Sequence, residues 1–217
     1  MFTWQTFPEL TTLSGSVLRH AFSLRAVGQP DAVLPSLLRP SVAALGWDEK
    51  GVVEAEQPHG HGVAVVGSAE GGRVIPGVDA LVTAEPGVVL AIRVADCGPV
   101  WFYDRVRRVA GLAHSGKKGT EQNIVGETLR TMGEAFGSVP ADVVVFLGPC
   151  IRPPYYEVAF AEEIGRQALA AGVASASYGD CGRNTAAELA TYYSYRAEKG
   201  QTGRMWAVAM IGEGSSS

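Results

Sequence analysis

The residues of this chain that could hold a metal are few and lie in particular places. There are only four histidines, at His20, His59, His61 and His114. His59 lies in the stretch EQPHGHG, Cys97 follows an apolar run in RVADCGP, and His114 ends the apolar run RRVAGLAH. Imidazole and thiolate are ligands that zinc and copper prefer. His59, Cys97 and His114 could therefore hold one cation if the fold brings these strand ends together.

Each of these residues also has an alternative role. His61 competes with His59, because residues two apart on a strand point the same way. Cys97 could be an inert buried thiol. Asp96 could act as a general base, could orient a ligand, or could brace a turn. The three cysteines are widely spaced and odd in number, so they predict a free thiol or a metal ligand rather than a disulfide framework.

The stretch GLAHSGKKGT (111–120) suggests an anion site. It is close to the phosphate-binding loop pattern, but Lys118 stands where that loop needs a Ser or Thr hydroxyl for magnesium, so a triphosphate is not expected. A loop that leads into a helix presents free N–H groups, and Lys117 and Lys118 add positive charge. A phosphate or carboxylate site and a solvated basic turn both fit this stretch.

The surrounding pattern predicts the elements that would position these residues. Runs rich in β-branched and aromatic residues predict strands over 88–95, 100–103, 107–114, 143–148 and 205–211. Helical spacing predicts helices over 120–137 with a Thr120 cap, near 160–171 and near 186–198. Residues 26–41 read as a loop or short helix. We expect an α/β fold, with α+β also open: one domain over 1–211 with a mixed, mostly buried β-sheet flanked by helices, and a flexible tail over 212–217.

Composition narrows the class of protein. The chain has 217 residues, of which 47% are hydrophobic and 18% charged, as in a globular domain. The formal net charge of −4 gives no broad attraction to nucleic acid, which is not expected as a partner. There is no signal-peptide pattern at the start and no apolar run of bilayer length, so we expect a cytoplasmic protein without a membrane partner. The sequence carries no signal for the oligomeric state.

Several stretches together resemble the motifs of the YfiH family. They are QPHG (57–60), GVDALVT (77–83), ADCGPV (95–100), AHSGKKGT (113–120), LGPCIRPPYYEV (147–158) and YSYRAEKGQTGR (193–204), preceded by HAFSLR (20–25). Their order and spacing cover most of residues 20–211. The family is variously named multicopper polyphenol oxidase, laccase-domain protein, peptidoglycan editing factor and purine nucleoside phosphorylase.

The resemblance implies a metal site and a substrate class. It implies that His59, Cys97 and His114 hold zinc or copper, and it favours His59 over His61. It implies an enzyme acting on a purine nucleoside (adenosine, inosine or methylthioadenosine), by phosphorolysis or by deamination with water. Arg25, Lys117 and Lys118 are the side chains that could then bind the phosphate. Amide hydrolysis of a cytoplasmic peptidoglycan precursor is an alternative.

This chain also departs from the family pattern. The family's HAGWRG-like block is HSGKKG here, so the aromatic residue is lost and the arginine is Lys118, which lacks the planar fork of a guanidinium. The segment after Arg25 is short and lacks the usual Gly-rich block, and the region 160–185 is abbreviated. An altered activity, or a metal-binding protein without catalysis, is therefore a further hypothesis.

The choice of metal follows from the inventory of ligands. Four histidines are too few for the multicopper cluster of a laccase. Two histidines and a cysteine could still form a blue-copper centre with an axial methionine, for which the candidates are Met132, Met205 and Met210. Three ligands with an open fourth position also match catalytic zinc, which is the cofactor we favour, with copper as the alternative.

Overall fold

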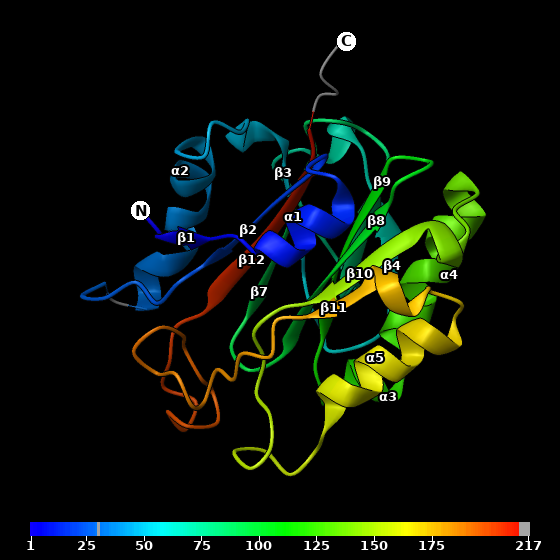
Figure 1. Cartoon of the computed structure of the whole chain (residues 1–217). Coiled ribbons are helices and arrows are strands. Elements are labelled where there is room, and N and C mark those ends of the chain that lie inside the picture. Colours follow the sequence, from blue (N-terminus) through cyan, green and yellow to red (C-terminus); the bar gives the residue numbers. More distant parts are fainter. Residues whose placement is uncertain (30, 213–217) are drawn as a thin grey trace.

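Two six-stranded sheets packed face to face form the centre of the computed structural model, which describes residues 1–29 and 31–212 (Figure 1). The strand order is β1-β2-β12-β7-β3-β5 in the first sheet and β11-β10-β8-β9-β6-β4 in the second. Each sheet mixes antiparallel with parallel pairs; β12 runs antiparallel to β7, for example, whereas β3 runs parallel to β7. The predicted α/β fold with a mixed sheet is confirmed, although the strands form two sheets rather than one.

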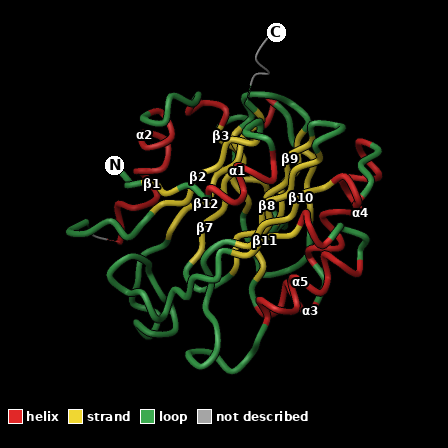
Figure 2. Tube along the Cα trace, in the orientation of Figure 1, coloured by secondary structure: helices red, strands yellow, loops and turns green. Residues whose placement is uncertain are grey.

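The strands and helices are short and regular (Figure 2). The first sheet comprises β1 (Trp4–Gln5), β2 (Leu18–Ser23), β3 (Val52–Ala55), β5 (Val74–Ile75), β7 (Val89–Val94) and β12 (Met205–Ile211). The second comprises β4 (Val63–Val65), β6 (Ala80–Thr83), β8 (Gly98–Asp104), β9 (Val109–Ser115), β10 (Val143–Leu147) and β11 (Tyr178–Asp180). The helices are α1 (Pro8–Ser14), α2 (Leu38–Ala43), α3 (Lys117–Glu121), α4 (Ile124–Phe136) and α5 (Phe160–Ala170), and α2 follows the 3-10 helix η1 (Asp31–Leu37).

Apolar side chains fill two layers on either side of the second sheet. Phe22 and Leu90 of the first sheet and Trp101 and Phe146 of the second are fully buried in the layer between the sheets. The Trp101 indole N–H also donates to the backbone oxygen of Val208 across this layer, at 3.1 Å. The other face of the second sheet is covered by α4 and α5, which pack on β6, β9 and β10 (Figure 1). The second sheet is therefore buried on both faces, as its continuous apolar runs predict.

The β8–β9 hairpin shows how local sequence fixes this sheet. One carboxylate oxygen of Asp104 accepts hydrogen bonds from the backbone N–H groups of Val106 and Arg107, at 2.8 and 2.9 Å. Such a side-chain turn reverses the chain directly after β8. The two strands then pair over their whole length, so the first residue of β8, Gly98, lies opposite the last residue of β9, Ser115.

Two of the predicted helices are wrong in part or in full. The helix predicted over 120–137 is broken at Asn123, which has a φ of 58° and caps α4 through its own side chain. Thr120 lies inside α3, where its hydroxyl donates to the oxygen of Gly116. The segment 186–198 forms a series of turns instead of a helix. Single turns are closed within it, for example by the Tyr192 N–H bond to the Glu188 oxygen, and between them the Arg196 backbone N–H donates to the distant Asp96 carboxylate.

Two other predictions concern the ends and the surroundings of the chain. The tail predicted over 212–217 lies, apart from Gly212, outside the described residues. Within residues 1–29 and 31–212, no helix is both long enough and apolar enough to cross a bilayer.

Candidate metal centre

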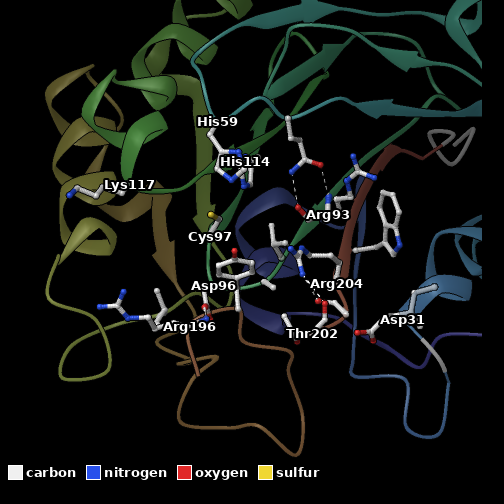
Figure 3. Close-up of a pocket in the computed structure, with 18 of the residues that line it drawn as sticks. Asp31, His59, Arg93, Asp96, Cys97, His114, Lys117, Arg196, Thr202 and Arg204 are labelled. Atoms are coloured by element: carbon white, nitrogen blue, oxygen red, sulfur yellow. Dashed lines mark hydrogen bonds between the residues drawn. The ribbon is translucent and has the colours of Figure 1, made fainter. Parts of the chain in front are cut away.

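Two strand ends and one loop bring the three predicted ligands together. Cys97 immediately precedes β8, and His114 lies opposite Pro99 in the antiparallel register, so the hairpin places both at the same edge. His59 reaches this edge from the loop between β3 and β4. The ligand atoms of His59, Cys97 and His114 all lie within 4.8 Å of one another. Figure 3 shows the three side chains gathered at one point of the cavity.

The backbone around the cluster adopts an uncommon conformation. His59 has a φ of 65° and Asp96 has a φ of 85°, in the region that residues other than glycine seldom occupy. Hydrogen bonds hold both residues there: His59 donates its backbone N–H to Asp79, and the Asp96 carboxylate accepts from Thr185 and from the backbone of Arg196. Strain that the surroundings maintain is typical of functional sites.

Position 116 needs a glycine because the backbone there passes close to the Cys97 sulfur. A Cβ atom at position 116 would lie 2.5 Å from the Cys97 Sγ atom, which is far inside van der Waals contact. The stretch HSGKKG therefore needs this glycine so that the chain can pass close to the thiol before α3 begins.

Asp79 orients both histidines. It is fully buried directly before β6, and its Oδ1 accepts hydrogen bonds from His114 Nδ1 at 2.8 Å and from the backbone N–H of His59 at 3.1 Å. Its Oδ2 accepts from the backbone N–H of Gly60 at 2.7 Å. Because the His114 Nδ1 proton is directed at a carboxylate, Nε2 is the ring nitrogen left to bind a metal.

The electrostatics of the cluster suit a cation. Burial alone would raise the pKa of the Cys97 thiol, but hydrogen bonds from His114 and His59 lower this pKa to about 6. For His114, burial opposes the charged form, and the hydrogen bonds to Asp79 and Cys97 outweigh it and raise the pKa to about 9. The site therefore favours a thiolate beside a positive charge, which is what a divalent metal ion would supply in place of the proton.

The residues that the structure describes offer three candidate ligands to this centre and no fourth. Within the described part of the chain, the only group of three or more candidate ligands is His59, Cys97 and His114. His61 is exposed and its Nδ1 is 2.6 Å from the Gln122 side-chain oxygen. Cys150 is fully buried in the apolar layer beneath α4 and α5. A three-ligand centre with an open position is typical of catalytic zinc rather than structural zinc.

The cluster opens into a cavity of about 970 Å³. Five basic residues line it, namely Arg93, Lys117, Arg196, Lys199 and Arg204, and Figure 3 labels all of them except Lys199. Three acidic residues also line it, Asp31, Glu56 and Asp96, and the Asp96 carboxylate is already engaged by two hydrogen bonds. Positive charge thus predominates here, although the chain as a whole carries a formal net charge of −4. The cavity is suited to an anionic ligand or co-substrate.

Comparison with known proteins assigns the family. A family model described as multi-copper polyphenol oxidoreductase laccase matches residues 26–168 and 158–212. The chain belongs to this laccase-domain family. The resemblance predicted from the motifs is thereby confirmed, and it extends over nearly all of the described residues.

Relatives in the laccase-domain family carry the name of one enzyme. Purine nucleoside phosphorylase SCO2081 from Streptomyces coelicolor is 40% identical over 162 residues, which are 75% of this chain and 65% of the relative. Purine nucleoside phosphorylase ORF3 from Streptomyces griseus is 38% identical over 134 residues, 61% of this chain and 54% of the relative. Purine nucleoside phosphorylase from Deinococcus radiodurans is 37% identical over 195 residues, covering 76% of this chain and 72% of the relative. The matches thus span less than two thirds of both Streptomyces proteins.

Solved structures of the laccase-domain family share the fold. The crystal structure of YlmD from Geobacillus stearothermophilus has a TM-score of 0.85 at 24% identity and covers 98% of this chain and 100% of that chain. The structure of the hypothetical protein YfiH from Bacillus licheniformis has a TM-score of 0.80 at 22% identity, covering 89% of this chain and 92% of that chain. The two-sheet arrangement is therefore the fold of these proteins.

Of the other predicted site residues of this laccase-domain chain, some line the cavity and some do not. Asp96 and Lys117 line the cavity, whereas Lys118 and Arg25 are not among its lining residues. Lys118 is exposed on α3. Arg25 forms an ion pair with Glu198 at 2.5 Å, and its guanidinium carbon lies 4.4 Å from the centroid of the Tyr193 ring.

Prediction from the sequence did not single out Asp79, which contacts two of the candidate ligands, or three of the arginines that line the cavity. Asp79 lies in the GVDALVT motif, and Arg196 and Arg204 lie in YSYRAEKGQTGR. Both motifs supported the family resemblance, so they were the available signal. Arg93 is near the end of an apolar strand, and no sequence motif marked it. In the structure it pairs with Trp206 of β12, and both residues line the cavity.

Proposed function

We propose that this chain is a zinc-dependent purine nucleoside phosphorylase. The observation that carries the proposal is the open His59, Cys97 and His114 group beside a cavity in which basic residues predominate. Relatives named purine nucleoside phosphorylase support the same activity. The substrates we propose are inosine, adenosine or methylthioadenosine, with inorganic phosphate as co-substrate.

Phosphorolysis would exchange one bond for another at the ribose. An oxygen of phosphate forms a bond to C1′ while the bond from C1′ to N9 breaks, and the bonding electron pair leaves on N9, which gains a proton. The products are the free purine and ribose 1-phosphate, or 5-methylthioribose 1-phosphate when the substrate is methylthioadenosine. A bound zinc ion would supply Lewis-acid polarisation to a nearby atom of the nucleoside. The second reaction proposed for the same centre is deamination of adenosine, in which water displaces ammonia.

The side chains of this chain would bind and orient the substrates. Basic residues of the cavity would neutralise the phosphate. The rings of Tyr156 and Tyr195 line the cavity and would offer apolar surface to the purine. Asp79 holds His114 in one tautomer. We assign Asp96 a positioning role, because its two oxygens accept hydrogen bonds from Thr185 and Arg196 on the loop that borders the cavity.

Zinc fits this arrangement better than blue copper does. A blue-copper centre needs a weak axial ligand, for which methionine is usual. Met132 and Met205 are fully buried, and the Met205 sulfur already accepts a hydrogen bond from the backbone of Tyr193. Met210 lies on β12, and none of the three methionines is among the residues that line the cavity.

The test is base release from inosine by zinc-loaded protein, with and without phosphate, in the wild type and in His59→Ala and His61→Ala variants. We expect phosphate-dependent release of hypoxanthine. His59→Ala should lose about two orders of magnitude or more in rate, because metal polarisation contributes several kcal/mol. His61→Ala is the matched control and should retain the rate, since His61 lies outside the cluster. Equal activity in both variants, or no release in any, would contradict the proposal.

A further inference from the structure

Two arginines lie at the end of the cavity formed by the first sheet, one on β7 and the other in the segment directly before β12. Arg93 of β7 lies opposite Trp206 of β12 in the antiparallel register, and Arg204 lies two residues before Trp206. Diagonal neighbours in such a pair are about 7–8 Å apart. Arg93, Arg204 and Trp206 all line the cavity. Figure 3 shows the two arginines on the side of the cavity away from Lys117.

The backbone of Arg93 is fixed from both sides by one side chain. The Gln57 amide nitrogen donates to the Arg93 oxygen at 2.7 Å, and the Arg93 backbone N–H donates to the Gln57 amide oxygen at 2.9 Å. Gln57 is buried and has a φ of 67°. Its amide continues the hydrogen-bond ladder of β7 beyond the end of β3. The position from which the Arg93 side chain extends into the cavity is therefore well defined.

Neither guanidinium is paired with an acidic residue in the described part of the chain. Among the described residues, the ion pairs within 4.0 Å include neither Arg93 nor Arg204. Arg204 Nη1 donates to the backbone oxygens of Thr202 and Gly203, both at 3.0 Å, and its guanidinium carbon lies 5.4 Å from the centroid of the Tyr195 ring. Its Nε and Nη2 have no hydrogen-bond acceptor among the described residues. No carboxylate among the described residues therefore neutralises either charge through an ion pair.

The acidic residues of the same cavity do not fill this role. Asp31 and Glu56 line it and are exposed. Glu56 accepts a hydrogen bond from the backbone N–H of Gly77 at 2.6 Å, and neither carboxylate lies within 4.0 Å of an arginine or lysine nitrogen in the described part of the chain. With Lys199 also lining the cavity, basic residues exceed acidic ones.

We infer that Arg93 and Arg204 form the phosphate-binding end of the cavity, an inference that rests on the proposed function. Two guanidinium groups with free N–H donors match the tetrahedral oxygens of phosphate, which arginine binds through paired hydrogen bonds. This assigns the phosphate to residues other than Arg25 and Lys118, which lie elsewhere. The bound group is either inorganic phosphate, the co-substrate, or the 5′-phosphate ester of a nucleotide. Protection experiments with each compound distinguish the two.

The direct test is chemical protection of Arg93. Phenylglyoxal modifies accessible arginines, and peptide mass spectrometry reports the rate at each one. We expect inorganic phosphate to slow modification of Arg93 and not of Arg73, which is exposed and does not line the cavity. Protection by inosine 5′-monophosphate but not by inorganic phosphate would support the site with an ester as the source. Protection by neither would overturn the inference.

Kinetics provide the second test. Arg93→Gln should raise the KM for phosphate in inosine phosphorolysis by about tenfold or more, the loss expected for a hydrogen-bonded charge pair, with kcat little changed. Arg73→Gln is the matched control and should leave both constants unchanged. An unchanged KM for phosphate in Arg93→Gln would overturn the inference. If phosphate protects Arg93 but no nucleoside is cleaved, the proposed function fails while the phosphate site stands.

Discussion

At the scale of single residues, the candidate metal centre is held in place by a carboxylate that is not itself a candidate ligand. Asp79 accepts hydrogen bonds from the His114 ring and from the backbone of His59 and Gly60, so one buried side chain fixes two of the three ligands. Residues that orient metal ligands in this way typically affect metal affinity by 10–100-fold, as an order of magnitude. Residue type was enough to single out the three candidate ligands, whereas Asp79 was marked only by its place in the GVDALVT motif, and its contact with His114 follows from the pairing of β6 with β9.

Asp79→Asn should lower zinc affinity by about 10–100-fold, because an amide holds the His114 N–H less strongly than a carboxylate does. Competition with a chromophoric chelator measures this change. Asp104→Asn is a matched control: Asp104 is equally buried and accepts two backbone N–H groups at the β8–β9 turn. It should reduce folding stability and leave zinc affinity unchanged. Equal zinc affinities in Asp79→Asn and the wild type would contradict the orienting role.

A second residue-scale prediction concerns stability and pH. Burial lowers the pKa of His20 from its ordinary value of 6.5, and its Nε2 accepts a hydrogen bond from the backbone N–H of Phe7 at 2.9 Å. Below pH 6.5 the unfolded chain binds a proton that the folded chain excludes, so the unfolding free energy falls as the pH falls. The stabilisation is fully present above this pH, and its loss has a slope of at most about 1.4 kcal/mol per pH unit.

His20→Gln provides the comparison, because a glutamine can accept the same hydrogen bond and does not titrate. We expect the wild type to be the more stable protein at pH 7.5 and its advantage to shrink between pH 6.5 and pH 5. Urea unfolding at several pH values measures the difference. A difference that is constant with pH would contradict this role for His20.

At the scale of elements, the cavity is bordered by a loop without regular secondary structure. Residues 184–204 carry Arg196, Lys199 and Arg204, and they connect through turns rather than through the helix predicted from their pattern. Arg25 anchors this loop through its ion pair with Glu198 and a hydrogen bond to the oxygen of Tyr192. Local sequence could not predict these contacts, because the partners are more than 160 residues apart.

Arg25→Ala should therefore loosen the loop without unfolding the sheets. The expected result is faster tryptic cleavage after Arg196 and Lys199 and a higher KM for phosphate. The sheets should stay folded, because a partly exposed ion pair contributes only about 1 kcal/mol to overall stability. Arg166→Ala is the control, because Arg166 forms an exposed pair with Glu163 on α5, away from the cavity. Equal cleavage rates in the two variants would contradict the anchoring role.

At the scale of the whole molecule, the apolar runs predicted the central strands well. Those over 88–95, 107–114, 143–148 and 205–211 became β7, β9, β10 and β12 with small shifts at their ends. The division into two sheets was not predictable, because β2, β7 and β12 pair across most of the chain length. The cavity could not be predicted from local sequence for the same reason, because its residues come from both sheets and from loops distant in sequence. Only the family motifs indicated that these segments meet.

The same architecture predicts how the protein responds to loss of metal. The two apolar layers are formed without the metal ligands, so chelation should lower Tm and leave the far-UV circular dichroism spectrum unchanged. His114→Ala should show no shift of Tm on chelation. Unfolding of the wild type by a chelator would contradict a catalytic site and indicate a structural one.

The measurement that tests the central claim most directly is zinc X-ray absorption spectroscopy on the purified, zinc-loaded protein. We expect one sulfur at about 2.3 Å, two imidazole nitrogens at about 2.0–2.1 Å and one exchangeable light atom in the open position. Cys97→Ser should remove the sulfur signal. Two sulfur ligands, or a sulfur signal that persists in Cys97→Ser, would contradict a centre built from His59, Cys97 and His114.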